Sequence, residues 1–188
     1  MTDKFYSVDR RGFYQTGLSL DLMKADPLKR PLLHLDGCYT EDDLKAHLQT
    51  LFPEGLSLHG WHYSVEMHNA VAHAHEEIET LYVNHAITVE LLFEYVRRAY
   101  FPQERSRFQS FFAWESLEKA IEFRQDDQPI YLIESDHILR ADQRWLSIGV
   151  QNIAGSLTAH NYWRGIPTDQ PCWEAVLSCP VKVKERVV

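Results

Sequence analysis

Residues 171–183 read Pro-Cys-Trp-Glu-Ala-Val-Leu-Ser-Cys-Pro-Val-Lys-Val, and the part from Val176 to Val183 has the β-branched content of a strand. One carboxylate, Glu174, stands at the start of this apolar stretch. An unpaired charge beside Trp173 and Val176 is costly unless a polar or cationic group meets it. Glu174 therefore either lies at an exposed strand end or has a functional role.

The size and composition are those of one folded domain. The chain has 188 residues, of which 45% are hydrophobic, 24% charged and 12% aromatic, so it is long enough for a real core and short for two domains. We therefore expect a single domain over residues 1–188. The net charge of -8 gives no support to nonspecific nucleic-acid binding, although a local basic site would be compatible with it.

The cysteines and the N-terminus indicate the compartment. Cys38, Cys172 and Cys179 form no CxxC pair and are odd in number, which favours a reducing cytosol. The sequence starts with strand-like residues rather than a signal peptide, and no apolar run approaches the ~20 residues of a membrane span. We expect a cytoplasmic protein with no membrane partner.

Helical and strand patterns alternate along the chain. Leu44, Leu48 and Leu51 have helical spacing after a cap at Thr40. Residues 65–100 contain almost no Gly or Pro, and their apolar spacing predicts two helices broken near residues 84–85, with Thr88 as the second N-cap. Strands are predicted near Tyr6, Phe112, Tyr131 and Val176, with a helix starting at Ser116. The outline is α+β, with the strands of both termini expected to pair in one sheet and an inserted helical block at about residues 65–100.

Six of the ten histidines lie between residues 59 and 85, so a metal site has to be considered. On a helix, His75 and Glu79 would share a face, with His68 two turns before His75. No HExxH motif is present, no cysteine ligand lies nearby, and the acidic residues 76, 77 and 79 resemble a solvated helix face. We predict no metal, and a histidine-based metal-dependent hydrolase remains an alternative.

The sequence gives little support to nucleophilic or phosphate-cradling sites. Cys38 has no motif that predicts a lowered pKa, and Ser156 is not in a GxSxG elbow. No P-loop occurs, and no GxGxxG follows a strand.

Three segments in chain order carry a resemblance. They are FYSVDR at residues 5–10, FFAWESLEKAIEF at 111–123 and WEAVL at 173–177. The first resembles a strand that grips NAD, the second an aromatic-aromatic-Ala strand followed by a helix with an Ala and then an aromatic residue, and the third a strand that opens with a catalytic Glu. Together they resemble the three signature strands of the ADP-ribosyltransferase superfamily, and the chain is similar to an uncharacterised bacterial family near it.

The resemblance implies a fold and a set of site residues. The fold would be a split, mostly antiparallel sheet, with NAD as co-substrate and Glu174 as the catalytic residue. Ser7 stands where members of the superfamily carry His or Arg, and Arg10 follows just beyond the strand as its substitute. The cofactor-binding residues implied in this way are Tyr6, Ser7, Arg10, Phe112 and Phe123.

An acceptor site is expected shortly before Glu174. Residues 159–165 would form a recognition loop in which Tyr162, Trp163 and Arg164 bind the substrate, unless Tyr162 and Trp163 simply close the core. Arg105, Arg107 and Arg124 flank the second segment, where they would form a cationic patch for pyrophosphate or lie on the surface.

The expected function is mono-ADP-ribosyl transfer from NAD to a protein or nucleic acid. By analogy with the superfamily, the setting would be a toxin or anti-phage effector held by an antitoxin protein. The competing interpretation is a binding module that keeps the fold and has lost the reaction.

Overall fold

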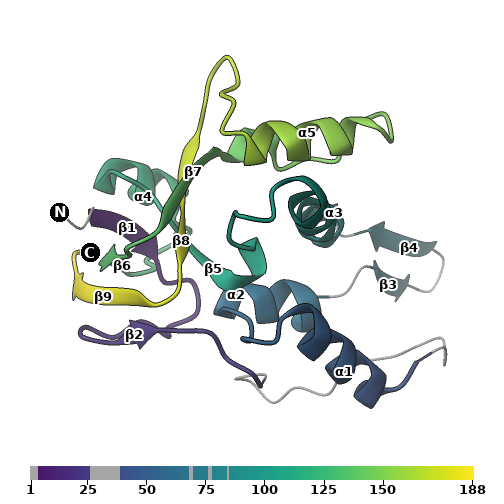
Figure 1. The fold of residues 1–188 in the computed structure, drawn as a ribbon, viewed down its shortest axis with the longest axis horizontal. Coiled ribbons are helices and arrows are strands. Elements are labelled where there is room, and N and C mark those ends of the chain that lie inside the picture. The colour runs from purple at the N-terminus through teal and green to yellow at the C-terminus, as the bar shows by residue number, and fades with distance from the viewer. Residues whose placement is uncertain (1–3, 26–38, 68–69, 76–77, 84) are drawn as a thin grey trace.

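The computed structural model describes residues 4–25, 39–67, 70–75, 78–83 and 85–188 (Figure 1). It is an α+β structure whose strands pair antiparallel. Sequence analysis predicted this class correctly.

The first sheet contains four strands in the order β1-β6-β9-β2. Their bounds are Lys4–Val8 for β1, Ile130–Glu134 for β6, Val181–Arg186 for β9 and Ser19–Leu20 for β2. β6 pairs with both β1 and β9, so the two terminal strands lie in one sheet, as predicted, but they do not pair with each other, because β6 lies between them.

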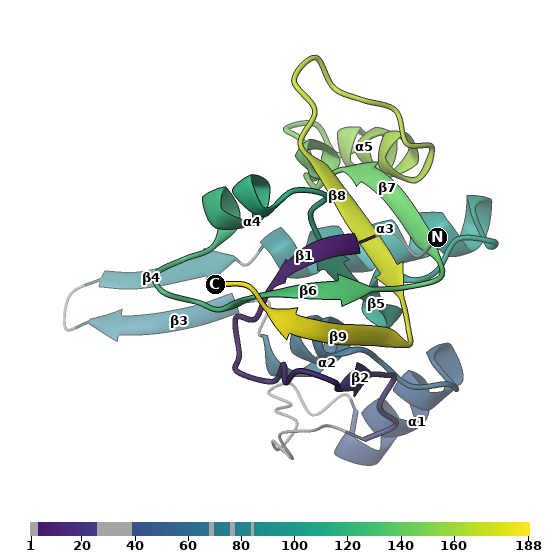
Figure 2. The same cartoon turned by 90° about the vertical axis from the view of Figure 1, so that its left-hand side faces the viewer.

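The second sheet contains β5 (Ser110–Ala113), β8 (Trp173–Ser178) and β7 (Ile138–Asp142), with β8 in the centre. Its strands cross those of the first sheet (Figure 2), and a single bridge between Tyr6 and Trp114 joins β1 to the end of β5. One buried cluster fills the space between the sheets and includes Phe5, Phe111 and Leu177. β8 therefore has a covered face toward this core.

Helices cover the remaining faces. α3 (His85–Tyr100) packs on α5 (Ala154–Trp163), and both contribute to a cluster with Val176 of β8. α4 (Leu117–Phe123) packs beside β1. α1 (Glu41–Leu51) begins with a capping box in which Thr40 and Asp43 bond to each other's backbone N–H groups.

Four short helical turns lie beside the two sheets and contribute to the wall of the pocket described below. They are α2 (Leu58–Trp61), the π-helical turn η1 (His62–Glu66), and the 3₁₀ turns η2 (Arg107–Gln109) and η3 (Gln143–Trp145). Gly60 of α2 lies so close to η2 that a Cβ atom there would be 2.0 Å from the carbonyl oxygen of Phe108. A glycine is therefore required for α2 to bring His59 against the second sheet.

The prediction of two helices over residues 65–100 was half wrong. α3 exists, but Ala70–His75 and Ile78–Val83 form an antiparallel hairpin, β3 and β4. Alternation in Ala-Val-Ala-His-Ala-His and the β-branched residues of Ile-Glu-Thr-Leu-Tyr-Val favour strands, and helical spacing over so short a stretch does not distinguish the two. The helical spacing assumed for His75 and Glu79 is therefore wrong, and His68 lies outside the described residues.

Residues 176–183 are also not one strand. β8 ends at Ser178 and β9 begins at Val181, and the two belong to different sheets. Pro180 has no N–H to give to a sheet, so the chain turns there and links the two sheets.

Candidate functional site

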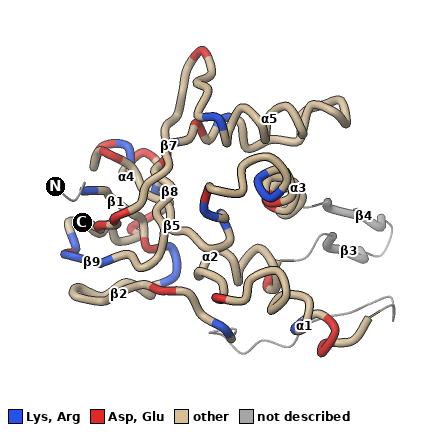
Figure 3. The backbone as a smooth tube through the Cα atoms, viewed as in Figure 1, with Lys and Arg blue, Asp and Glu red and all other residues tan. Residues whose placement is uncertain are grey.

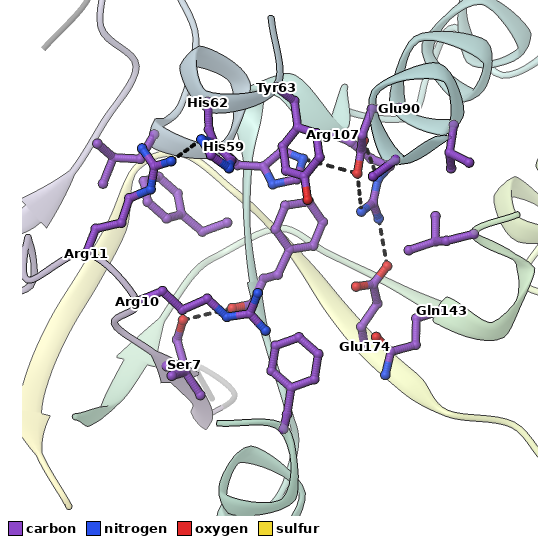
Figure 4. Close-up of a pocket in the computed structure, with 18 of the residues that line it drawn as sticks. Ser7, Arg10, Arg11, His59, His62, Tyr63, Glu90, Arg107, Gln143 and Glu174 are labelled. Carbon is purple, nitrogen blue, oxygen red and sulfur yellow. Dashed lines mark hydrogen bonds and ion pairs between the residues drawn. The ribbon is translucent and has the colours of Figure 1, made fainter. Parts of the chain in front are cut away.

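A pocket of about 920 Å³ lies where the two sheets meet (Figure 4). Its floor is formed by residues of β1, β5 and β8, and its walls by α2, η1, α3, α4 and the segment 143–149. The pocket is thus assembled from segments spread over most of the chain, and Glu174 is part of its lining.

Glu174 is 5% exposed and is held by one of its two carboxylate oxygens. Oε1 accepts hydrogen bonds from Arg107 Nη1 at 2.6 Å and from the hydroxyl of Tyr162 at 2.7 Å. No described residue donates a hydrogen bond to Oε2. Figure 4 shows the carboxylate between Arg107 and the open part of the pocket. The charge that the sequence left unexplained therefore has a buried cation as partner.

Arg107 joins Glu174 to a second carboxylate, Glu90 of α3. Its Nε and Nη2 atoms donate to the two oxygens of Glu90 at 2.9 and 2.8 Å, and its guanidinium lies 4.4 Å from the centre of the Phe112 ring. All three charged side chains are about 5–6% exposed. Two negative charges and one positive charge are thus gathered in a region shielded from water.

The charges shift the ionisation of this cluster. Burial alone would raise the pKa of Glu90, but the charges of Arg107 and His59 outweigh it and hold the pKa well below its usual range. Burial would lower the pKa of Arg107, and the charge of Glu90 outweighs that effect and raises it. Burial also raises the pKa of Tyr162 well above normal, so its hydroxyl stays protonated and donates to Glu174.

His59 lies between the cluster and the pocket. Its ring centre is 4.5 Å from that of Tyr63 and 4.6 Å from that of Phe112. Nε2 is 3.2 Å from Glu90 Oε1, but the geometry is not that of a hydrogen bond, and this buried atom has no hydrogen-bond partner among the described residues. His59 therefore places in the pocket wall a buried ring nitrogen that lies near Glu90 without a hydrogen bond to it.

Arg10 is a cation without an acidic partner among the described residues. Its guanidinium lies 4.2 Å above the Phe123 ring and makes no ion pair with any described residue. Burial lowers its pKa. The turn that carries it is fixed by Asp9, whose carboxylate accepts the backbone N–H groups of Arg11 at 3.2 Å, Phe13 at 3.1 Å and Tyr14 at 2.8 Å.

The neighbouring Arg11 is bound differently. Its guanidinium donates to both oxygens of Glu66, at 3.2 and 2.9 Å, and His62 Nδ1 lies 2.9 Å from the same carboxylate. This contact ties the turn after β1 to η1. Of the two adjacent arginines, only Arg10 is available to a ligand's negative charge.

The structure brings together five of the residues predicted for the site: Ser7, Arg10, Phe112, Phe123 and Glu174 all line the pocket. Ser7 is 2% exposed and donates to the carbonyl oxygen of Phe112 at 2.8 Å, and a hydrogen bond of 3.2 Å joins its hydroxyl to that of Tyr14. Ser7 thus ties β1 to β5. Tyr6 is not part of the pocket lining, and packs with the cluster under α4.

Residues 159–163 of the expected recognition loop belong to helix α5, and Tyr162 and Trp163 close the core, which is the alternative that the sequence left open. Tyr162 is fully buried behind Glu174, and Trp163 is 3% exposed and donates from Nε1 to the carbonyl of Phe93 at 3.0 Å. Arg164 is exposed at the C-terminal cap of the helix. Helix α5 lacks a side-chain N-cap, which removed the usual sequence signal for its start.

Three members of the cluster around Glu174 were not predicted in their observed roles. Glu90 was not predicted at all, His59 belonged only to the histidine group weighed for a metal site, and Arg107 was expected in a pyrophosphate patch or on the surface. A signal was present in α3, where Glu90 and Glu94 fall among the apolar positions Val89, Phe93 and Val96. Acidic residues on the core side of a helix indicate a buried cation. In Figure 3 the helix carries both acidic and basic positions.

The arrangement of the described His, Cys, Asp and Glu side chains bears on the alternative of a metal site. Within the part of the chain that the structure describes, no three His, Cys, Asp or Glu side chains are placed to hold a metal ion. Cys172 and Cys179 are free thiols, and burial raises the pKa of Cys179 to about 12. Cys38 lies outside the described residues.

No helix among the described residues is long and apolar enough to cross a membrane.

The chain was also compared with known proteins. No curated protein matches the chain. A family model described as a protein of unknown function, DUF2441, matches residues 18–188, and the chain therefore belongs to the DUF2441 family.

Proposed function

We propose that this protein transfers ADP-ribose from NAD to a macromolecule, with Glu174 as the catalytic residue. The observation that carries the proposal is that Glu174, Arg10 and Phe123, from three distant segments, line one pocket. These are the segments on which the resemblance to ADP-ribosyltransferases rests. The sheet divides into two parts that meet at the Tyr6–Trp114 bridge, which agrees with the split sheet of the proposed fold.

The lining of the pocket fits the chemical groups of NAD. Its volume of about 920 Å³ lies within the range typical of ligand pockets. Arg10 has a charge free for the pyrophosphate, since no described carboxylate neutralises it. Phe112 and Phe123 also line the pocket and would contact the nicotinamide or adenine, with the guanidinium groups of Arg107 and Arg10 lying over their rings.

The reaction would break the bond between the ribose C1′ and the nicotinamide nitrogen. The bonding electrons leave with nicotinamide, which becomes neutral, and C1′ develops cationic character. Glu174 would stabilise this centre by its charge and by accepting the hydrogen bond of a ribose hydroxyl at Oε2. A nucleophile of the acceptor then bonds to C1′ and releases its proton, so the products are ADP-ribosyl acceptor, nicotinamide and one proton.

The acceptor remains a protein or a nucleic acid in this proposal. A role as a toxin or anti-phage effector held by an antitoxin protein rests on the resemblance alone. Identification of labelled acceptors in a cell extract would define the substrate class.

The test is transfer of label from NAD carrying ³²P in its phosphates. The wild-type protein should label an acceptor in cell extract, and Glu174→Gln should remove the label. Glu185→Gln changes an exposed carboxylate on β9 and should have no effect. Absence of NAD binding by calorimetry in the wild-type protein would refute the proposal.

A second candidate is a module with this fold that binds a nucleotide without reacting. The observation that favours it is the burial of Glu174 in an ion pair with Arg107, because buried ion pairs are often structural. NAD binding without release of nicotinamide, equal in the wild type and in Glu174→Gln, would support this candidate.

A further inference from the structure

The two oxygens of Glu174 have different surroundings. Oε1 receives two hydrogen bonds, from Arg107 and Tyr162, and no described residue donates to Oε2. A carboxylate fixed at one oxygen can rotate little, so the direction of the other oxygen is set by the protein rather than by the ligand.

The anchors of Glu174 are themselves fixed. Arg107 is held by two hydrogen bonds to Glu90 and by its contact with the Phe112 ring. Tyr162 is fully buried, and its ring packs at 5.4 Å from that of Phe93. Neither anchor is free to follow a ligand that enters the pocket.

The net charge of the cluster formed by Glu90, Arg107 and Glu174 also bears on the role of Glu174. If Arg107 faced Glu174 alone, the pair would be neutral. Glu90 adds a second carboxylate and takes the two-fold contact with Arg107, while Glu174 receives a single contact from one Nη atom. Glu90, Arg107 and Glu174 together bring two carboxylates and one guanidinium, so one negative charge is in excess among these three side chains, and Glu174 Oε2 is an atom through which it can act on the pocket.

We infer that Arg107, Tyr162 and Glu90 are positioning residues for Glu174: Arg107 and Tyr162 fix Oε1, Glu90 balances the charge of Arg107, and Oε2 is presented to the ribose hydroxyl. This inference rests on the proposed function. In this arrangement the ion pair between Arg107 and Glu174 orients the catalytic carboxylate and is more than a structural contact.

Tyr162→Phe is the sharpest test, because it removes one hydroxyl and keeps the ring that packs on Phe93. Thr168→Val is a matched control, since Thr168 donates its hydroxyl to another buried carboxylate, that of Asp142, at 2.7 Å. Each variant loses one hydroxyl donor to a buried acid, but only Tyr162→Phe changes the support of Glu174.

Two quantities should be measured for both variants: the kcat of nicotinamide release and the Kd of NAD by calorimetry. Tyr162→Phe should lower kcat by roughly tenfold to a hundredfold, as expected when a reacting group is misplaced, and should leave Kd within about twofold. Thr168→Val should keep both values. Glu90→Gln should also lower kcat, because the cluster then loses its net negative charge.

The inference is overturned if Tyr162→Phe keeps the wild-type kcat, as Thr168→Val is expected to, while Glu174→Gln is inactive. That result would leave the proposed function intact. A wild-type protein that binds no NAD would overturn the proposed function, and the inference with it.

Discussion

Replacement of Arg107 by Met should destabilise the fold severely, because it leaves two buried carboxylates without a cation. Arg107 makes three hydrogen bonds of 2.6–2.9 Å to Glu90 and Glu174, and the side chains are about 5–6% exposed. Loss of one partner of a buried ion pair costs about 3–5 kcal/mol. Met has a similar length and fills most of the space, so the loss reports on charge rather than on a cavity.

The control is Arg105→Met, two residues away. Arg105 lies 3.2 Å from Glu54, and the two side chains are 45% and 66% exposed. Exposed pairs of this kind contribute about 0–1 kcal/mol. Urea unfolding at pH 7 should therefore separate the two variants by several kcal/mol, and Arg107→Met should lower Tm by about 6–20 °C.

The pH dependence of the free energy of unfolding is a second measure of the charge effect in Arg107→Met. The pKa of Glu90 is lowered in the folded protein, so its pairing contributes stability above the unfolded pKa of about 4.3 and loses this contribution as the pH falls. In Arg107→Met the buried, ionised Glu90 is instead unfavourable, and protonation relieves it. The gap in stability between wild type and variant should therefore narrow as the pH falls from 7 to about 4.

Two results would refute this reasoning. One is a decrease in the free energy of unfolding of Arg107→Met below about 1 kcal/mol, comparable to that of Arg105→Met. The other is a large loss that is the same at pH 7 and pH 4, which would mean that shape rather than charge accounts for it.

Three further predictions are independent of that cluster. Arg10→Gln should raise the Kd of NAD about tenfold in calorimetry, since a charged hydrogen bond is lost, and the exposed Arg144→Gln should not. Thr40→Ala should lower the free energy of unfolding by about 1 kcal/mol in urea, because the N-cap of α1 is removed; no change would mean that this helix end frays in the native state. Cys179, with its pKa raised to about 12 by burial, should react with iodoacetamide at pH 8 far more slowly in the folded protein than in urea, and equal rates would contradict its burial.

The sequence predicted the parts of the fold that depend on local pattern. The strands at Tyr6, Phe112, Tyr131 and Val176 were found from their β-branched and aromatic residues, and the capped helix at residues 41–51 from its leucine spacing. The hairpin at residues 70–83 was missed, because apolar residues at helical spacing also fit short strands.

The candidate site was predicted only in outline. The order of three segments placed Glu174, Arg10 and Phe123 in one pocket, but the partners of Glu174 are 67 and 12 residues away in the sequence. Such contacts depend on how α3, α5 and β8 pack, which no local pattern encodes. The sequence therefore left open whether Tyr162 binds an acceptor or closes the core, and it did not predict the contact of Tyr162 with Glu174.

Release of nicotinamide from NAD, measured by chromatography with purified protein, tests the central claim most directly. The wild type and the surface variant Glu185→Gln should release nicotinamide at the same rate. Glu174→Gln should lower the rate at least a hundredfold, as expected on the order of magnitude when a preorganised electrostatic group is lost, while it still binds NAD. Equal release by the wild type and Glu174→Gln, or no release by any of the three with acceptor present, would contradict the assignment of Glu174 as the catalytic residue.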